Sequence, residues 1–331
     1  MSGKNCLVSI IVTTYNRADM LGDALKSLIA LEIDGHIFYE ILVIDDASTD
    51  YTGDVVESIR CISDVPIRYY IEDGKGVARA RNRGIKETSG EWVVFFDDDQ
   101  IAEICWLKEL LAATEKIGTL CVGGQVRLLF PEKNSAELPE FCRGLLGETH
   151  HGNSLKKFTN KILPATNNVM INRTIFNTIG FFNESMIHGS EDAEFFRRTR
   201  EAGFEMWYAP NALIYHITPS YRLTKKYLTW TSLRHGVSYA FIDYNEHGLK
   251  KVVSVCILRM AQAILITGLH FLNAWLHHED KKQLQATCLI LRAIGYLRET
   301  FFLLSPKTFP QSSFYKHIRF RQKRNMFSTW G

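Results

Sequence analysis

Several features that define other protein classes are scarce or missing in this sequence of 331 residues. Its seven cysteines are scattered and form no Cys-x-x-Cys pair, which argues against a disulfide framework or a zinc site and favours reduced thiols in a cytosol-facing protein. The net charge of +3 is too small to indicate nucleic acid as a partner. The apolar run at 7–12 is too short for a signal peptide, so we expect none at the N-terminus.

The composition that is present is that of an ordinary globular protein, with 46% apolar and 23% charged residues. A chain of this length predicts two domains, or one α/β domain with an appendage. Over the first hundred residues, short apolar runs alternate with helical patterns, which indicates an α/β protein with a doubly wound, mostly parallel sheet. The strands that we expect there lie at 7–12, 40–44, 67–71 and 92–96.

Beyond residue 120 the pattern is less regular. Strands are expected at 122–130 and 169–172, and the polar segment 131–160 is typical of an irregular insertion. Ser190 can cap a later helix, which the turn residue Gly203 ends.

Three consecutive carboxylates, Asp97, Asp98 and Asp99, follow the strand expected at 92–96. A strand that ends in acids carries them to the carboxyl edge of the sheet, where open α/β folds bind ligands. Adjacent carboxylates repel each other, so they need a cation in order to stay ionised together. Oxygen ligands suit Mg²⁺ or Mn²⁺, which commonly share their coordination with substrate phosphates. The alternative is a solvated acidic turn.

The strand expected at 40–44 also ends in acids. Asp45 or Asp46 can accept hydrogen bonds from a nucleotide base or from ribose hydroxyls. A basic stretch further along can supply cations for a diphosphate, although a solvated helix face explains any single arginine equally well. Its members are Lys75, Arg79, Arg81 and Arg83. No phosphate-binding Walker loop is present.

In the stretches that contain these acids and in several others, the sequence resembles the family-2 glycosyltransferases, which are inverting enzymes of the GT-A fold. The resemblance spans about residues 7–220 and lies in seven stretches, in the order of the family. They are VSIIVTTYNR (8–17), VIDDASTD (43–50), GVARARNRG (76–84), GEWVVFFDDD (90–99), GFFNE (180–184), SEDAE (190–194) and PNALIYH (210–216). Each is unspecific alone, but seven in order are a strong signal.

The resemblance implies the transfer of one sugar from a nucleotide diphosphate sugar to a hydroxyl, with inversion. The acceptor would be a saccharide or lipid-linked, in the synthesis of a cell-surface polysaccharide or glycan. Thr13, Tyr15 and Asp46 match residues that hold the nucleotide. Asp97 and Asp99 match the metal motif, and Asp98 lies near the donor sugar or its ribose. The family often has proline in place of Thr13.

The resemblance also implies roles for residues that act on the acceptor and on the metal. Asp192 matches the catalytic base, with Glu191 beside it on the acceptor side. His216 matches a histidine that joins the metal in several relatives; the alternative is a satisfied buried histidine at the end of a strand. An aromatic residue often follows the acid pair, but here it is Ala193.

Asp192 can also be argued from the chemistry. An inverting transfer needs one base, which takes a proton from the acceptor hydroxyl as that hydroxyl attacks. Glu191, Asp192 and Glu194 open a predicted helix, where the helix dipole favours ionised carboxylates. Ordinary first-turn acids are the alternative explanation.

Three other functions share parts of this pattern. A haloacid-dehalogenase-type phosphatase also begins from an apolar strand and Asp-x-Asp, but it usually has Thr or Val where Ile101 stands, and it leaves Asp45 and Asp46 unexplained. A sugar nucleotidyltransferase should show a glycine-rich loop after the first strand, and residues 13–17 contain no glycine. A nucleotide-sugar-binding protein without catalysis remains open. Processive polymer synthesis is not expected, because no Gln-x-x-Arg-Trp string occurs.

We expect a catalytic domain at 1–225, with a nucleotide-sugar half at about 1–125 and an acceptor half at about 126–225. A helical, basic region at 226–331 should follow. Its apolar segment 252–276 carries a polar stripe, which favours peripheral attachment to the cytoplasmic face of a membrane over a spanning hairpin or a soluble cap. The stripe consists of Arg259, Gln262, His270, Asn273 and His277. A second apolar segment (284–304) and a basic tail (316–324) fit the same interpretation.

Overall fold

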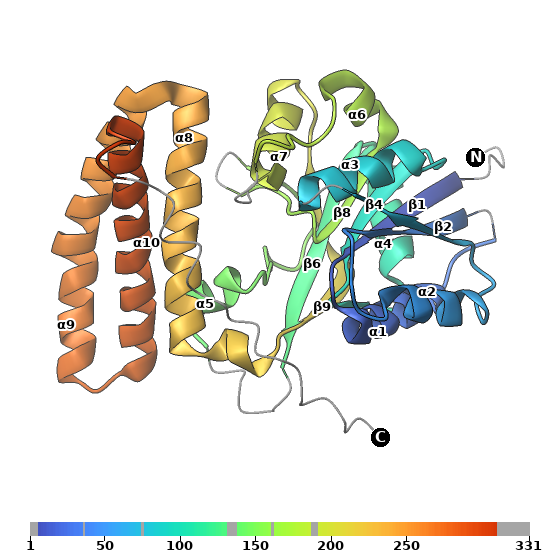
Figure 1. The fold of residues 1–331 in the computed structure, drawn as a ribbon, viewed down its shortest axis with the longest axis horizontal. Coiled ribbons are helices and arrows are strands. Elements are labelled where there is room, and N and C mark those ends of the chain that lie inside the picture. Colours follow the sequence, from blue (N-terminus) through green and yellow to red (C-terminus); the bar gives the residue numbers. More distant parts are fainter. Residues whose placement is uncertain are drawn as a thin grey trace. The chain divides into compact units, whose positions relative to one another are not determined.

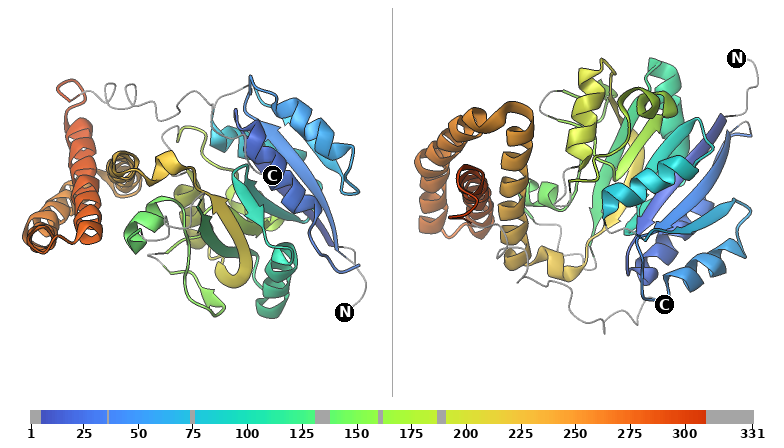
Figure 2. Two further views of the ribbon diagram at one scale, coloured as in Figure 1. Left: turned by 90° about the horizontal axis from the view of Figure 1, so that it is seen from below. Right: turned by 45° about the horizontal axis from the view of Figure 1, so that its top comes forward.

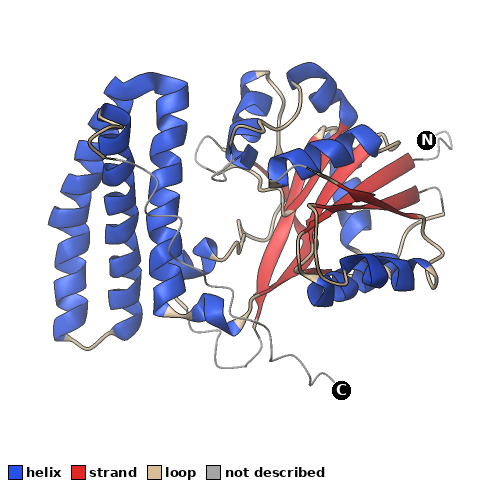
Figure 3. Ribbon diagram, in the orientation of Figure 1, coloured by secondary structure: helices blue, strands red, loops and turns tan. Residues whose placement is uncertain are grey.

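The computed structural model divides the chain into two compact units (Figure 1). The first consists of Met1–Leu129 and Gly147–Thr218, and the second of Phe130–Leu146 and Pro219–Gly331. The residues that the structure describes are 6–35, 37–73, 76–130, 138–159, 162–186 and 191–309. The first unit contains the strands and the second is helical (Figure 3).

The first unit is built on one mixed sheet with the strand order β3-β2-β1-β4-β8-β6-β9-β5. Its parallel half consists of β1 (Cys6–Thr14), β2 (Ile37–Asp45), β3 (Ile67–Ile71) and β4 (Trp92–Asp97). These are the four strands expected from the apolar runs. The α/β class and the mostly parallel sheet are therefore confirmed.

The second half of the sheet runs in both directions. It consists of β5 (Gln100–Ala102), β6 (Cys121–Leu129), β7 (Lys156–Lys157), β8 (Asn168–Asn172) and β9 (Trp207–Ile217). β8 is antiparallel to β4 and β6, whereas β6 and β9 are parallel. The described part of the segment 131–160, which we expected to be irregular, contains β7 and a short helix and is otherwise irregular.

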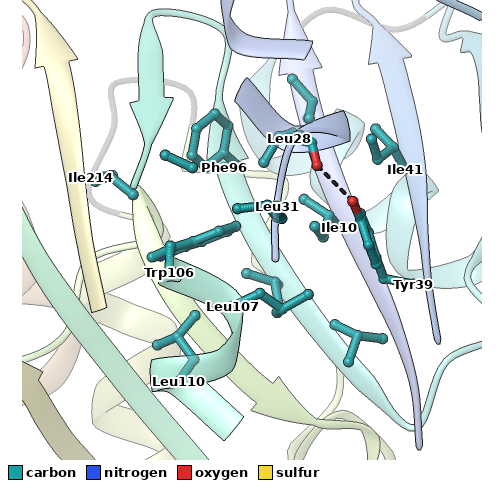
Figure 4. Close-up of a cluster of buried hydrophobic side chains, with 14 of the residues drawn as sticks. Ile10, Leu28, Leu31, Tyr39, Ile41, Phe96, Trp106, Leu107, Leu110 and Ile214 are labelled. Carbon is teal, nitrogen blue, oxygen red and sulfur yellow. Dashed lines mark hydrogen bonds between the residues drawn. The ribbon is translucent and has the colours of Figure 1, made fainter. Parts of the chain in front are cut away.

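Helices cover both faces of the sheet (Figures 1 and 3). On one face lie α1 (Ala18–Ile29), α2 (Thr52–Arg60) and α4 (Trp106–Ile117), and on the other lie α3 (Val77–Glu87), α6 (Arg173–Ile179) and α7 (Glu191–Glu201). Because strand side chains alternate, Ile10 packs into the first layer and Ile11 into the second. Figure 4 shows part of the first layer, where the Tyr39 hydroxyl donates a hydrogen bond of 2.8 Å to the carbonyl of Leu28.

The second unit is a helical assembly, which confirms the helical C-terminal region. Its elements are α5 (Glu140–Leu145), η2 (Ser220–Leu223), α8 (Lys225–Gln262), the π-helical turn η3 (Ala263–Thr267), α9 (Gly268–Leu276) and α10 (Asp280–Leu304). Gly248 interrupts α8 with a left-handed φ of 73°, which glycine adopts without strain. The chain reverses its direction near this kink, and α10 lies against both α8 and α9 (Figure 2).

Two glycines allow α8 and α10 to cross at backbone contact. A Cβ atom on Gly236 would lie 2.0 Å from the carbonyl oxygen of Arg292, and one on Gly295 would lie 2.0 Å from that of Leu233. Near this crossing the Tyr296 hydroxyl donates to Asp243 at 2.8 Å. Polar side chains therefore lie inside the helical unit.

The polar stripe expected on 252–276 is divided in the structure. The Arg259 guanidinium lies over the rings of Tyr296 and Tyr239, at 4.7 and 5.7 Å from their centroids. Arg259 is thus turned into the helical unit. The other four members of the stripe are exposed: Gln262, His270, Asn273 and His277.

Candidate active site

The carboxyl ends of β1, β2 and β4 meet at one edge of the sheet. Thr13 is in register with Asp97, and its neighbour Thr14 is in register with Asp45. The two groups of acids that the sequence placed at strand ends therefore share an edge, as expected for a ligand-binding edge of a parallel sheet.

Asp45 and Asp46 have different surroundings. Asp45 is 2% exposed, and its two carboxylate oxygens accept hydrogen bonds from the Tyr69 hydroxyl at 2.5 Å and the Ser48 amide at 2.8 Å. Asp46 is partly exposed and accepts a hydrogen bond of 3.0 Å from the amide of Gly76. Asp45 therefore holds the loop after β2, and Asp46 is the acid of the pair that a ligand can reach more easily.

The loops after β1 and β2 are fastened to each other by Asn16. Its amide donates to Ser48 Oγ, and its side-chain oxygen accepts from the amide of Thr49, both at 2.8 Å. Asn16 has a left-handed φ of 51°. On either side of this anchor, Thr13 is partly exposed and Tyr15 is 43% exposed, so both can meet a ligand at this edge.

Arg17 pairs with the acidic turn. Its Nη1 donates to Asp98 Oδ1 at 2.7 Å and to Asp99 Oδ2 at 3.0 Å, and both aspartates are 3% exposed. Burial alone would lower the pKa of Arg17, but the charges of Asp98 and Asp99 outweigh it and raise that pKa. The protein itself therefore supplies part of the positive charge that the three acids require.

The pairing of β9 with β5 places His216 beside the same acidic turn. β9 pairs with β5 so that His216 is opposite Gln100, and the amide of Ile217 donates to the carbonyl of Asp99 at 2.8 Å. Nε2 of His216 lies 3.3 Å from Asp99 Oδ1. The Gln100 side chain accepts from the amide of Asp97 at 3.0 Å and so closes the turn.

Asp97, Asp99 and His216 offer two carboxylates and an imidazole to a divalent cation. Asp97 lies within electrostatic reach of both other side chains; burial raises its pKa, and the charge of Arg81 opposes this shift. Among the described residues, no three His, Cys, Asp or Glu side chains are arranged to hold a metal ion by themselves. The metal site at these three residues therefore stays a prediction.

Of the three arginines on α3, Arg81 faces the acids. Its side chain is 7% exposed, Nη1 lies 2.5 Å from Glu191 Oε1, and Nη2 lies 3.7 Å from Asp97 Oδ1. The other two are more exposed and pair elsewhere: Arg79 with Glu72 and Arg83 with Glu87. Lys75, the other predicted phosphate contact, lies outside the described residues, as does Ser190.

Asp192 follows Glu191 in the first turn of α7. Its Oδ1 accepts a hydrogen bond of 2.7 Å from the amide of Ala193. Burial raises the pKa of Asp192 to about 6; the neighbouring charge of Glu191 adds to this shift and that of Arg81 opposes it. A carboxylate with such a pKa is ionised at neutral pH but accepts a proton more readily than an ordinary aspartate.

Sequence reasoning assigned no role to Arg17 or Gln100. The signal for Arg17 was its place directly after the first strand, at the same edge as the acids. The role of Gln100 depends on the turn geometry at 97–100, for which the sequence carries no specific signal.

The model of glycosyl transferase family 2 matches residues 9–180, just over half of the chain. The chain belongs to glycosyl transferase family 2. The matched region includes both acid groups of the site and ends before α7 and β9. The predicted family is therefore confirmed.

Similar proteins of this family include two with long matches. Glycosyltransferase AglE of Haloferax volcanii is 26% identical over 212 residues, which are 63% of this chain and 66% of that protein. The succinoglycan biosynthesis protein ExoM of Rhizobium meliloti is 24% identical over 260 residues, 78% of this chain and 82% of its own length. An uncharacterized glycosyltransferase of Rickettsia felis is 38% identical over 94 residues, and the chain covers 15% of its length.

Solved structures share the fold at low sequence identity. The mannosyltransferase PcManGT of Pyrobaculum calidifontis, in complex with GDP-Man and Mn²⁺, has a TM-score of 0.60 and 16% identity, with 91% of this chain and 87% of that one covered. TarS 1–349 of S. aureus, in complex with UDP-GlcNAc, has a TM-score of 0.52 and 17% identity, with 87% and 91% covered. The GT-A-like architecture is therefore confirmed.

Proposed function

We propose that this protein transfers one sugar from a nucleotide diphosphate sugar to a hydroxyl of a saccharide or lipid-linked acceptor, with inversion at the anomeric carbon. The observation that carries this proposal is that one buried arginine, Arg81, contacts acids from two distant parts of the chain. Arg81 contacts Asp97 at the end of β4 and Glu191 at the start of α7. The edge that would bind the donor and the acid that would accept the proton thus belong to one unit of the fold.

The nucleotide half of the donor would bind across the ends of β1 and β2. Thr13 and Tyr15 would contact the base and ribose, and Asp46 would accept their hydrogen bonds. Asp45 would act indirectly by holding the loop that carries Asp46. Asp98 would lie near the donor sugar or its ribose, and Arg81 and Lys75 would supply positive charge to the diphosphate.

In the transfer step the acceptor oxygen forms a bond to the anomeric carbon while the bond from that carbon to the diphosphate oxygen breaks. Asp192 takes the hydroxyl proton, and the diphosphate leaves with the electron pair. Attack from the face opposite the leaving group inverts the anomeric centre. Glu191 would lie beside the base on the acceptor side, and its Oε2 is buried with no hydrogen-bond partner among the described residues.

Asp97, Asp99 and His216 would hold Mg²⁺ or Mn²⁺ at this edge. The cation, when bound, supplies charge stabilisation to the leaving diphosphate. The structure of PcManGT with Mn²⁺ supports the choice of ion. A haloacid-dehalogenase-type phosphatase is not supported, because the chain belongs to another family.

The names of two relatives support a role in cell-surface polysaccharide or glycan synthesis. ExoM is a succinoglycan biosynthesis protein, and a poly-beta-1,6-N-acetyl-D-glucosamine synthase of Staphylococcus epidermidis is 23% identical over 274 residues. The test of the proposed function is a panel of nucleotide sugars with Mg²⁺ or Mn²⁺, in which release of the nucleoside diphosphate is measured. We expect release from one donor or a few related donors. Tight donor binding without release in the presence of candidate acceptors would favour a nucleotide-sugar-binding protein without catalysis.

We also propose that the second unit attaches the protein to the cytoplasmic face of a membrane. Within the described residues, one helix, Lys225–Leu276, is long and apolar enough to cross a bilayer by length and composition. Nine apolar side chains on its part after Gly248 are at least 53% exposed, and we call them the apolar ridge. They are Ile257, Leu258, Ile264, Leu265, Ile266, Leu269, Leu272, Trp275 and Leu276.

The surroundings of the apolar ridge favour peripheral attachment over a spanning helix. Four polar members of the predicted stripe are exposed on the same segment, and helices of this amphipathic kind lie in the membrane interface. Exposed lysines lie before the ridge, at Lys250 and Lys251, and after it, at Lys281 and Lys282. Lysines in these positions are attracted to anionic headgroups.

A further inference from the structure

Arg81 joins two parts of the candidate site that come from distant positions in the chain. Its Nη1 donates to Glu191 Oε1 at 2.5 Å, and its Nη2 lies 3.7 Å from Asp97 Oδ1. Asp97 ends β4, and Glu191 begins α7 immediately before Asp192. One buried guanidinium therefore links the strand of the metal motif to the helix of the candidate base.

The neighbour of Arg81 on α3 fastens the segment that precedes α7. Asn82 Oδ1 accepts from the amide of Phe182 at 3.0 Å, and its Nδ2 donates to the carbonyl of Phe182 at 2.9 Å. The same Nδ2 donates to Glu184 Oε1 at 2.8 Å. α3 thus holds the loop around Phe182 through Asn82 and the first residue of α7 through Arg81.

Glu191 is held in a buried ion pair. It is 5% exposed and already shares a short ion pair with a guanidinium that stays charged. Breaking this pair would leave the Arg81 charge without its partner, which is costly for a buried pair. Asp192 is the acid of the two that is partly exposed and whose described hydrogen bond comes from a backbone amide.

We propose that Glu191 is a positioning residue, which through its ion pair with Arg81 fixes the first turn of α7 and so aims Asp192 at the donor. This proposal rests on the proposed function, because it assigns Asp192 as the proton acceptor. Small displacements of a reacting group have large effects on rate, so a pair that fixes one helix end can control turnover without contacting the reacting atoms.

The test compares Glu191→Gln with Glu194→Gln, a matched control on the same helix. Glu194 pairs with Arg198 at 2.6 Å, away from Arg81. We expect Glu191→Gln to lower kcat by roughly 10- to 100-fold, with little change in the donor KM. We expect the control to keep the kcat of the wild type.

Two further measurements separate positioning from a general loss of stability. Among the described residues, the charged groups that shift the pKa of Asp192 are Glu191, which raises it, and Arg81, which lowers it. Glu191→Gln should therefore move the acid limb of the pH profile to lower pH, whereas Arg81→Gln should move it to higher pH. Amide hydrogen exchange in the first turn of α7 should become faster in Glu191→Gln and stay unchanged in Glu194→Gln.

The possible outcomes are distinguishable. Wild-type kcat together with unchanged exchange in Glu191→Gln would overturn the proposal. A complete loss of turnover, with the acid limb abolished and not shifted, would make Glu191 the base and also overturn it. If the wild-type protein transfers no sugar to any acceptor, the proposed function fails, and the hydrogen-exchange comparison still decides whether Glu191 holds the helix.

Discussion

Arg17 Nη1 lies 2.7 Å from Asp98 Oδ1, and this ion pair places a permanent positive charge inside the acidic turn. The same nitrogen lies 3.0 Å from Asp99. Three adjacent acids need a cation in order to stay ionised together, and the structure shows that Arg17 provides a positive charge beside two of them.

Replacement of Arg17 should make the unfolding free energy depend more strongly on bound metal. We expect Arg17→Gln to lose on the order of 2 kcal/mol of unfolding free energy without metal, because Asp98 and Asp99 lose their partner while buried. Mn²⁺ should then raise the Tm of this variant more than that of the wild type, since a ligand of the native state stabilises it. Thermal unfolding with and without Mn²⁺ measures both effects. Arg79→Gln, an exposed arginine on α3, is the control.

Asp99 should be essential for metal-dependent nucleotide binding. We expect Asp99→Ala to abolish transfer and to weaken Mn²⁺-dependent binding of the nucleotide, which calorimetry or Mn²⁺ EPR can measure. The reason is that Asp99 and His216 lie 3.3 Å apart and would share the cation. Full activity of the wild type in excess EDTA would contradict this role of the metal.

Asp192→Asn should separate donor binding from turnover. We expect it to fold and to bind donor normally, yet to lose roughly 10²-fold or more in kcat, the order of a general base. In the wild type kcat/KM should fall below about pH 6, because burial raises the pKa of Asp192 to about 6 and only the ionised form can accept a proton. A variant within about threefold of the wild type would place the base elsewhere.

Asp192→Asn should raise the stability of the fold at neutral pH, although it lowers turnover. A raised pKa means that the folded protein holds this proton more tightly than the unfolded chain, so stability falls as pH rises from about 4 to about 6. Asp192→Asn removes this loss, and we expect a gain on the order of 1 kcal/mol at pH 7. Chemical unfolding at pH 7 and at pH 4 measures the difference, which should be small at pH 4.

The apolar ridge should govern membrane attachment. We expect Leu265→Asp with Leu269→Asp to release the protein from vesicles that contain anionic lipid, because both side chains are more than 60% exposed and their insertion would be lost. Ile62→Asp is a matched control, since Ile62 is 69% exposed on the first unit. Vesicle flotation measures the binding.

Fractionation of cells distinguishes the modes of attachment. Release by high salt or carbonate supports peripheral association, whereas release by detergent alone supports a spanning helix. Quantitative recovery in the low-salt soluble fraction would leave only a soluble helical cap. If the protein forms a soluble dimer that does not bind vesicles, the apolar ridge is the interface with a second copy of the chain.

Much of the first unit could be predicted because its signals are local. The apolar runs at 7–12, 40–44, 67–71 and 92–96 each match a strand, and the acids that follow 40–44 and 92–96 lie at one edge of the sheet. Short, nearly continuous hydrophobic runs are typical of strands that are buried on both faces of a parallel sheet, so these runs could be assigned as strands from the sequence.

The parts that could not be predicted depend on long-range contacts. The pairing of Arg81 with Glu191 joins residues 110 positions apart, and no spacing rule indicates it. The grouping of Phe130–Leu146 with the helical unit is also a tertiary property, although the sequence assigned that segment to the acceptor half. The crossing of α8 and α10 at Gly236 and Gly295 could not be predicted either, because a single glycine in a helix does not indicate which helix packs against it.

We propose that one edge of the sheet binds the donor and that Asp192 accepts the proton during the transfer. The most direct test is nucleoside diphosphate release from the panel of nucleotide sugars, measured side by side for the wild type, Asp99→Ala and Asp192→Asn with Mn²⁺. We predict release by the wild type, metal-dependent donor binding without turnover by Asp192→Asn, and neither by Asp99→Ala. A wild type that is inert toward every donor, or an Asp192→Asn variant as active as the wild type, would contradict the account.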